Sequence, residues 1–237
     1  LLRLLDIIRY LAKQNLALRG HREYENEDCP PNRGNCLELV GMMSTYDVVL
    51  SEHLTKLALS NKKCAVSYLS PRIQNEFINV LGQQVREKIL RNVREAKYFA
   101  LILDGTPDVS RKDQTSQILR YVMIDGSEVN VVESFVDIIE TEGKTAEALT
   151  TLTLTKLSKD GLDIQDCRGQ AYDNASPMVG IYKGVQARTR AINPKVIFVN
   201  CTNHSLNLAG NHAAAQTIQS QTIFGTLGEL YRYFSSS

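Results

Sequence analysis

The sequence lacks an excess of either charge, a long hydrophobic segment and a regular set of cysteines. Its 27 Lys and Arg residues balance 26 Asp and Glu residues, giving a formal net charge of +1, so we expect no overall attraction to nucleic acid or anionic lipid. The longest obvious apolar run, Tyr98 to Leu103, has six residues, and a membrane span needs roughly 20. The five cysteines are odd in number and irregularly spaced, which favours reduced thiols over a disulfide framework.

Motifs of three common enzyme classes are also missing. The sequence has no G-x-G-x-x-G after a strand, no G-x-x-x-x-G-K-[ST] and no G-x-S-x-G. These absences argue against a dinucleotide-binding domain, a P-loop nucleotide hydrolase and an α/β-hydrolase. No membrane and no small-molecule cofactor are therefore expected as partners. Hydrophobic residues nevertheless make up 43% of the chain, which is enough to build a sizeable core.

Residues 1–96 have the pattern of a helical region. Apolar residues recur at helical spacing from Leu1 to Ala12 and again from Leu37 to about Leu59. Ser70-Pro71 is a helix start signal, and that helix is expected to run to about Ala96. Residues 20–36 contain glycine, proline and several acids and are expected to form a polar loop. Because the chain starts at Leu1 inside a helical pattern, we expect it to be a piece of a longer protein.

Residues 97–237 alternate between strand and helix patterns. Strands are expected at 98–103, 116–124, 129–139, 165–172 and 196–199, and helices at 145–159, at 184–192 and from about 202 onward. Asp125-Gly126-Ser127 is a hairpin turn signal between the second and third strands. The first two connections are short enough for antiparallel neighbours, whereas the later ones require crossovers between parallel strands. The predicted fold is α/β, with three antiparallel strands followed by parallel ones in a ribonuclease H-like mixed sheet.

Two acids follow predicted strands directly, Asp104 in LILDGTPD and Asp173 in GQAYDNAS. If those strands are neighbours, the two carboxylates face each other across one site. Such a pair resists joint ionisation unless cations lie between its members. Two Mg²⁺ ions held by carboxylates are a common device for cutting and joining phosphodiesters. The alternative interpretation is that each Asp caps a turn or a helix, and for either residue alone this alternative is favoured.

Cys201 and His204 form a C-x-x-H motif between the last predicted strand and the following helix. Two ligands do not complete a tetrahedral zinc site, and no second pair with matching spacing exists. A buried thiol and a hydrogen-bonded imidazole are therefore the expected roles.

Basic residues are concentrated in two segments. Residues 174–228 contain Lys183, Arg188, Arg190 and Lys195 and no acid, and residues 62–97 contain eight bases and three acids. These segments are candidates for a groove that binds a phosphate backbone. A solvated helix face is the alternative explanation, and we favour it for the bases of residues 86–94.

Several blocks of the sequence resemble one known family. They are LAKQNLALRGHRE (11–23), the segment 68–90, YFALILDGTPDVS (98–110), QILRYV (117–122) and, most specifically, the segment 169–208. They are similar to hAT-superfamily transposases, in particular to the zinc-finger MYM-type-like branch of domesticated copies. The resemblance implies a ribonuclease H-like core at 97–237 preceded by the helical region 1–96.

The resemblance also implies a function. A D-D-E triad in that family binds two divalent metals, Mg²⁺ or Mn²⁺, to cleave and join DNA. Asp104 and Asp173 match the first two acids and the metal ligands, and Cys201 and His204 match the C-x-x-H element beside the active site. The third acid, a Glu, is expected downstream of residue 237, and Glu229 does not match it. Gly105 and Pro177 depart from the family's usual Ser and Asn.

Two functional hypotheses follow from the resemblance. The first is a transposase-like fragment with ancestral metal-dependent DNA cleavage and transfer, incomplete or inactive as given. The second is a domesticated, non-catalytic module that binds DNA or protein in the nucleus. DNA and a second copy of the chain are the expected partners under either hypothesis. A third, plainer reading is an α/β domain whose acids only cap turns.

Overall fold

The computed structural model describes residues 1–20, 32–59, 67–107, 113–141, 143, 145–173 and 175–235. Most of the predicted polar loop, residues 21–31, lies outside the described residues. The chain forms two compact units, Leu1–Arg86 and Glu87–Ser237. No helix within the described ranges is long and apolar enough to cross a bilayer.

The first unit is helical, as its sequence pattern predicts. It contains α1 (Leu2–Lys13), α2 (Gly34–Ser44), α3 (Val48–Leu59) and the first part of α4 (Pro71–Ala96). Its core is formed by apolar residues of all four helices: Leu4, Ile7, Ile8, Leu11, Cys36, Val40 and Leu50, with Phe77 and Leu81 packed against them. The prediction for α4 is confirmed at both ends.

The single helical stretch predicted from Leu37 to Leu59 is wrong in one respect, because the chain turns at residues 45–47. Asp47 starts α3 by accepting a 2.9 Å hydrogen bond from the backbone N–H of Leu50. It also receives a 2.8 Å bond from Nε of Arg3 in α1. This local capping bond ends one helix and begins the next, although the apolar spacing continues across the break.

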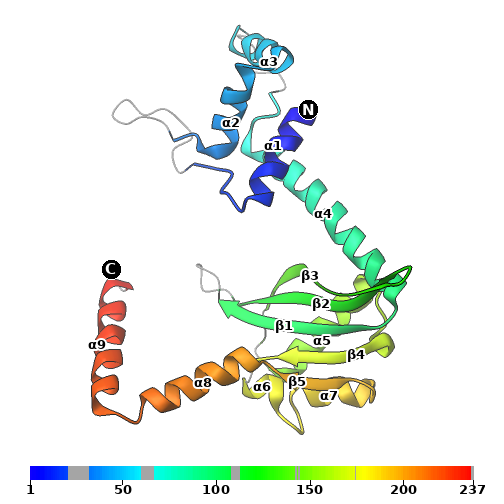
Figure 1. Cartoon of the computed structure of the whole chain (residues 1–237), viewed down its shortest axis with the longest axis vertical. Coiled ribbons are helices and arrows are strands. Elements are labelled where there is room, and N and C mark those ends of the chain that lie inside the picture. Colours follow the sequence, from blue (N-terminus) through cyan, green and yellow to red (C-terminus); the bar gives the residue numbers. More distant parts are fainter. Residues whose placement is uncertain are drawn as a thin grey trace. The chain divides into compact units, whose positions relative to one another are not determined.

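The second unit is built on a five-stranded mixed sheet, shown in Figure 1. Its strands are β1 (Phe99–Pro107), β2 (Asp113–Asp125), β3 (Glu128–Glu140), β4 (Cys167–Tyr172) and β5 (Ile197–Asn200). They lie in the order β3-β2-β1-β4-β5. The pairs β1–β2 and β2–β3 are antiparallel, and β1–β4 and β4–β5 are parallel. The predicted ribonuclease H-like sheet is therefore confirmed.

Helices cover one face of this sheet. The covering elements are the end of α4, α5 (Ala146–Lys159) and α7 (Val185–Ile192). Their apolar residues form one core with every second residue of the central strands: Leu90, Val93, Leu101, Leu103, Leu119, Tyr121, Leu157 and Val185. The alternation arises because successive side chains of a strand point to opposite faces.

The β2–β3 hairpin turns at Gly126 and Ser127, as the sequence predicts, since Asp125 pairs with Glu128. Gly126 has a φ of +59°, and a positive φ at the first loop position matches a type II′ turn. Beyond β4 the chain forms the short α6 (Ser176–Val179), and beyond β5 it forms α8 (Thr202–Ala214) and α9 (Ile218–Ser235). None of the residues of α8 and α9 is buried.

Candidate functional site

Asp104 and Asp173 belong to neighbouring strands of the sheet. Asp104 lies inside β1, where it pairs with Ser116 of β2, so the prediction that it follows the strand is wrong, whereas Asp173 directly follows β4 as predicted. Ile102 of β1 pairs with Ala171 of β4, and the same register continued by two residues places Asp104 opposite Asp173. Neighbouring strands are about 4.8 Å apart, so the backbones that carry the two acids are close. Adjacency of the two strands, the condition for a shared acidic site, is therefore met. The catalytic role of the two residues stays a prediction.

The surroundings of the two acids differ. Asp104 is exposed, and its backbone carbonyl accepts a 3.1 Å hydrogen bond from the hydroxyl of Ser116 on β2. Asp173 is half-buried, and its Oδ1 accepts a 3.1 Å bond from the backbone N–H of Ala175. The turn-capping role that was weighed for Asp173 is therefore present. It occupies one oxygen and does not exclude a second role for the carboxylate.

Asp173 also lines a cavity of about 250 Å³ at this end of the sheet. Asp113, at the start of β2, lines the same cavity, together with the hydroxyl-bearing Thr115 and Thr141, the backbone of Gly105, and the apolar Leu149, Pro177 and Met178. Thr115 and Thr141 hydrogen-bond to each other through their hydroxyls at 2.9 Å. Asp104 is not among the lining residues. The structure therefore brings Asp173 together with a carboxylate that the sequence pattern did not single out.

Cys201 and His204 begin α8 beside the same strand ends. The backbone N–H of Cys201 donates a 3.0 Å hydrogen bond to the carbonyl of Tyr172, the last residue of β4. Tyr172 pairs with Asn200, so Cys201 lies one position further on, opposite Asp173. Both Cys201 and His204 are half-buried, so the prediction of a buried thiol is wrong for Cys201. The C-x-x-H motif is thus next to the second acid in space as well as in the family pattern.

The donor set suits a hard divalent cation better than zinc. Within the part of the chain that the structure describes, no three His, Cys, Asp or Glu side chains cluster closely enough to hold a metal among themselves. Mg²⁺ commonly takes one or two carboxylates and keeps several of its waters, which Asp104 and Asp173 are able to provide. Structural zinc needs four protein ligands and catalytic zinc three. Asp104 and Asp173 therefore fit Mg²⁺ or Mn²⁺.

Gly105 and Pro177, the two residues that differ from the family pattern, are both compatible with the local structure. Pro177 lies in the first turn of α6, where its missing N–H costs no helical hydrogen bond. A Cβ added at Gly105 would meet nothing within 4 Å, so a serine in its place would fit. Neither residue disturbs the strands that carry the acids.

The four predicted DNA-binding bases do not form one cluster around the acids. Arg188 lies within 3.8 Å of Glu147 at the beginning of α5, and its Nε donates to the carbonyl of Lys183. Lys195 lies at the other end of the sheet. Its backbone N–H donates to the side chain of Asn193, and the amide of Asn193 donates to the carbonyl of Cys167, the first residue of β4. The six steps along the chain from Cys167 to Asp173 correspond to about 20 Å in an extended strand. Arg190 and Lys195 are exposed.

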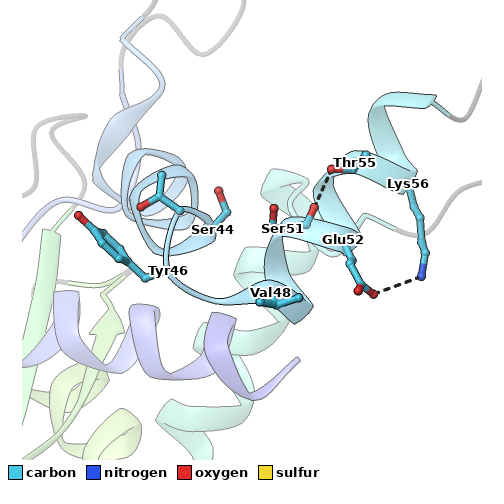
Figure 2. Close-up of a pocket in the computed structure, with 8 residues that line it drawn as sticks. Ser44, Tyr46, Val48, Ser51, Glu52, Thr55 and Lys56 are labelled. Carbon is cyan, nitrogen blue, oxygen red and sulfur yellow. Dashed lines mark hydrogen bonds and ion pairs between the residues drawn. The ribbon is translucent and has the colours of Figure 1, made fainter.

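A second cavity, of about 330 Å³, lies in the helical unit between α2 and α3. Figure 2 shows that hydroxyl side chains and the Glu52–Lys56 ion pair line it. Three of its hydroxyls are engaged with backbone carbonyls of α2 and α3: Ser44 donates to Gly41, Thr45 to Met42 and Thr55 to Ser51.

The match to a known family decides what kind of domain this is. The ZMYM1/FAM200 RNase-like domain family (DUF4371) matches residues 1–184. The chain belongs to this family. Membership agrees with the observed sheet order, and it confirms the resemblance to transposase-derived proteins that the sequence blocks predicted. The DUF4371 match extends across both units, from the helical region into the segment after Asp173.

Two curated relatives are similar over nearly the same span. The 52 kDa repressor of the inhibitor of the protein kinase of Mus musculus is 26% identical over 237 residues, which cover 99% of this chain and 30% of that protein. The Homo sapiens protein of the same name is 28% identical over 209 residues, covering 86% of this chain and 26% of that protein. The chain thus spans less than a third of the length of these relatives.

Proposed function

We propose that this RNase-like domain binds Mg²⁺ or Mn²⁺ through Asp104 and Asp173 and acts on the phosphodiester backbone of DNA as part of a longer nuclear protein. The single observation that supports the proposal is the register of the parallel strands β1 and β4, in which Ile102 pairs with Ala171, two residues before each acid. Bound there, a divalent cation supplies charge neutralisation and a Lewis acid for phosphodiester chemistry.

Under this proposal, residues of the chain bind the cation, support the strand ends and contact DNA. Asp104 and Asp173 hold the cation, and the Ala175 N–H keeps the Asp173 carboxylate in place from one side. Cys201 and His204 support the strand ends from α8 through the backbone bond between Cys201 and Tyr172. The guanidinium of Arg188 donates to the backbone carbonyl of Lys183, and these two bases are assigned to contacts with DNA phosphates, whereas Arg190 and Lys195 are not.

A second candidate function is a non-catalytic module that binds DNA or protein in regulation. One observation favours it, the name of the two relatives. The relatives are named as repressors of the inhibitor of a protein kinase, a name that describes regulation rather than strand transfer. Under this function the sheet is retained as a scaffold and the cation is lost.

Metal binding is tested first with the 237-residue chain. Mn²⁺ broadens the NMR signals of nearby nuclei, so the backbone signals around residues 104 and 173 are expected to broaden at substoichiometric Mn²⁺. The variants Asp104→Asn and Asp173→Asn are expected to abolish the effect, since an amide is a poor ligand for a hard cation. The Asp173→Asn side chain still accepts the bond from Ala175, so the turn is preserved. Asp125→Asn, in the exposed hairpin, is the matched control and is expected to leave the broadening unchanged.

Activity is tested with the longer protein that contains this domain. Strand cleavage of a DNA duplex in Mg²⁺ is expected to fall by about 10³-fold in either Asp→Asn variant, since a metal contributes several kcal/mol to such reactions. Cleavage at the wild-type rate by Asp173→Asn would remove Asp173 from the mechanism. Manganese binding without any cleavage would favour the regulatory module. Absence of both would overturn the proposal.

A further inference from the structure

Tyr98, the residue before β1, has two cations against its ring. The guanidinium carbon of Arg168, in β4, lies 4.1 Å from the ring centroid, and Nζ of Lys97 lies 5.6 Å from it. The Tyr98 side chain is 49% exposed. In the part of the chain that the structure describes, neither cation forms an ion pair with a carboxylate. The three residues, here called the Tyr98 site, therefore present uncompensated positive charge to solvent.

The backbone departs from regular geometry at both cations. Phe99 pairs with Cys167 and Ala100 with Gly169, so Arg168 is an extra residue in β4, which makes a β-bulge. A bulge turns a side chain into a direction that the regular strand would not give it. Lys97 follows α4 with a φ of +62°, in the left-handed region where glycine is favoured and a lysine is strained. Both irregularities set a positive charge against the same ring, and such strain is concentrated at functional sites.

The guanidinium of Arg168 is fixed in place but keeps free donors. Its Nη1 donates to the carbonyls of Gln165 at 2.8 Å and Cys167 at 2.9 Å, and the Tyr98 ring supports one side of its plane. No described residue accepts a hydrogen bond from its Nε or Nη2. The parallel N–H groups on these two nitrogens match two oxygens of a phosphate, which an arginine binds better than a lysine because its fork is rigid.

The Tyr98 site lies on the same face of the sheet as Asp104. Phe99, Leu101 and Leu103 are buried in the core, so the alternation along the strand places Tyr98 and Asp104 on the opposite face. The six steps between these two residues correspond to about 20 Å of extended chain. Duplex DNA rises about 3.4 Å per base pair, so about six base pairs cover the same distance. One duplex is therefore long enough to reach both the Tyr98 site and the acids.

We propose that the Tyr98 site binds a backbone phosphate of duplex DNA about six base pairs from the position of the acids. The choice of DNA rests on the proposed function, whereas the preference for phosphate rests on Arg168 and Lys97. Arg168 holds the phosphate through Nε and Nη2, and Lys97 adds a second positive charge beside it. A phosphate contact fixes the position of a duplex without reading its bases. The Tyr98 site is therefore a positioning site, separate from the chemistry at the acids.

DNA binding in the absence of divalent metal gives the first test. Fluorescence anisotropy of a labelled duplex of about 20 base pairs is measured with the 237-residue chain in EDTA at about 0.1 M salt. Arg168→Gln is expected to raise Kd by about fivefold to tenfold and to lower the slope of log K against log salt by about one, since one phosphate contact is lost. Two unrelated duplexes should show the same loss. Lys195→Gln, at an exposed lysine of the same end of the sheet, and Lys13→Gln, in the helical unit, are the controls, and their Kd should change by less than about twofold.

Lys97→Gly separates binding from folding. Glycine relieves the strain at a φ of +62°, so this variant is expected to unfold at a higher urea concentration than the wild type. Its Kd for the duplex should nevertheless rise by about twofold to fivefold, because a charge beside the phosphate is lost. Tyr98→Phe keeps the ring and should bind like the wild type, whereas Tyr98→Ala removes the support of Arg168 and should bind more weakly. Circular dichroism confirms the folding of each variant.

Three outcomes would overturn the assignment of the Tyr98 site. The first is wild-type affinity for the duplex in the Arg168→Gln and Lys97→Gly variants. The second is an equal loss in Lys195→Gln and Arg168→Gln, because the general charge of this end of the sheet would then hold the DNA. The third is a labelled polyglutamate peptide whose binding is weakened by Arg168→Gln while DNA binding is not, since the partner would then be an acidic protein segment.

The acids are tested separately in the same assay. Asp104→Asn and Asp173→Asn remove the proposed metal ligands and two negative charges near the DNA, so each variant should bind the duplex in EDTA at least as tightly as the wild type. Failure of the manganese experiment together with a loss of binding in Arg168→Gln would remove the metal centre and keep the Tyr98 site. Manganese broadening around residues 104 and 173 with no effect of Arg168→Gln would do the reverse.

Discussion

The phenolic hydroxyl of Tyr172 donates a 3.0 Å hydrogen bond to Oε1 of Gln170, two residues earlier in β4, and both side chains are buried. The amide of Gln170 in turn donates to the carbonyl of Gln186 in α7 at 3.1 Å. This chain of bonds fixes the strand that ends at Asp173 against the helix that covers it. The position of the second acid therefore depends on a buried polar network as well as on apolar packing.

Replacing Tyr172 with Phe is expected to destabilise the protein by about 1–2 kcal/mol, because the Gln170 oxygen loses its donor in a buried position. Urea unfolding followed by circular dichroism measures the change. A loss below about 0.5 kcal/mol would contradict a role for this bond in stability.

The same substitution is expected to change the response to alkaline pH. Burial raises the pKa of the Tyr172 phenol well above its ordinary value, so the folded protein keeps this proton above about pH 10, where the unfolded chain releases it. The unfolded state then binds fewer protons, and stability falls as pH rises beyond that point. Tyr172→Phe lacks this contribution. The wild-type protein should lose more stability than the variant between about pH 9 and pH 11, in urea unfolding across this range of tyrosine ionisation.

Asn193 is expected to be among the costliest single positions in the sheet unit. Its fully buried side chain donates to the carbonyls of Ile164 at 2.7 Å and Cys167 at 2.9 Å, and accepts from the N–H of Lys195 at 3.0 Å. Asn193→Ala leaves these groups unpaired and should cost about 2–4 kcal/mol in urea unfolding. Asn207→Ala, at an exposed position of α8, is the matched control, with an expected change within about 0.5 kcal/mol.

The bond between Arg3 and Asp47 makes the helical unit sensitive to acid. The hydrogen bond from Arg3 lowers the pKa of the Asp47 carboxyl, with help from the Leu50 N–H. Stability from this group is present above the unfolded pKa of about 3.9 and is lost as pH falls through the lower folded value. Asp47→Asn keeps a cap for α3 but loses the charge, so its unfolding midpoint should depend less on pH below about 5. Asp47→Ala removes cap and charge together and should be the less stable variant at neutral pH. Equal pH profiles for the Asp47→Asn variant and the wild type would contradict this account.

Gly126 tests the geometry of the hairpin. Gly126→Ala places a Cβ at a φ of +59°, where an L-residue is strained by roughly 1 kcal/mol, although the added atom would meet nothing within 4 Å. Gly105→Ala also adds a Cβ in open space, but at a residue without a positive φ. The Gly126→Ala variant should therefore have its unfolding midpoint at a lower urea concentration than the wild type, whereas the midpoint of Gly105→Ala should be unchanged. Equal midpoints would show that Gly126 tolerates a side chain.

The sequence pattern was sufficient to predict the directions of the strands, and the ribonuclease H-like fold that it indicated implied their order. The apolar runs, the Asp125-Gly126 turn and the lengths of the later connections leave few topologies for the sheet. The break at residues 45–47 was missed because apolar spacing continues through it, and only the capping acid Asp47 marks it. Helix α4 was predicted correctly because Ser70 and Pro71 specify its start and Ala96 is followed at once by a strand.

The candidate site was only partly predictable. The sequence pattern left adjacency of the strands before Asp104 and Asp173 as a condition, and the observed strand order meets it. The approach of Asp113 to the same cavity depends on β2 starting at residue 113 rather than 116, a shift that apolar periodicity does not detect. Arg190 and Lys195 were grouped with Lys183 because they are close in sequence. Helix α7 instead returns along the sheet and carries them away from the acids.

The outer edge strand, β3, limits how copies of this protein are able to meet. It runs for 13 residues with one side of its backbone unpaired by the sheet, and it carries Glu128, Glu133, Asp137 and Glu140. Two such strands brought together as one continuous sheet would set these negative charges against each other, which natural edge strands use to prevent fibre-like growth. Replacing these acids with neutral residues would remove that protection, so such variants are expected to be more prone to ordered aggregation than the wild-type protein.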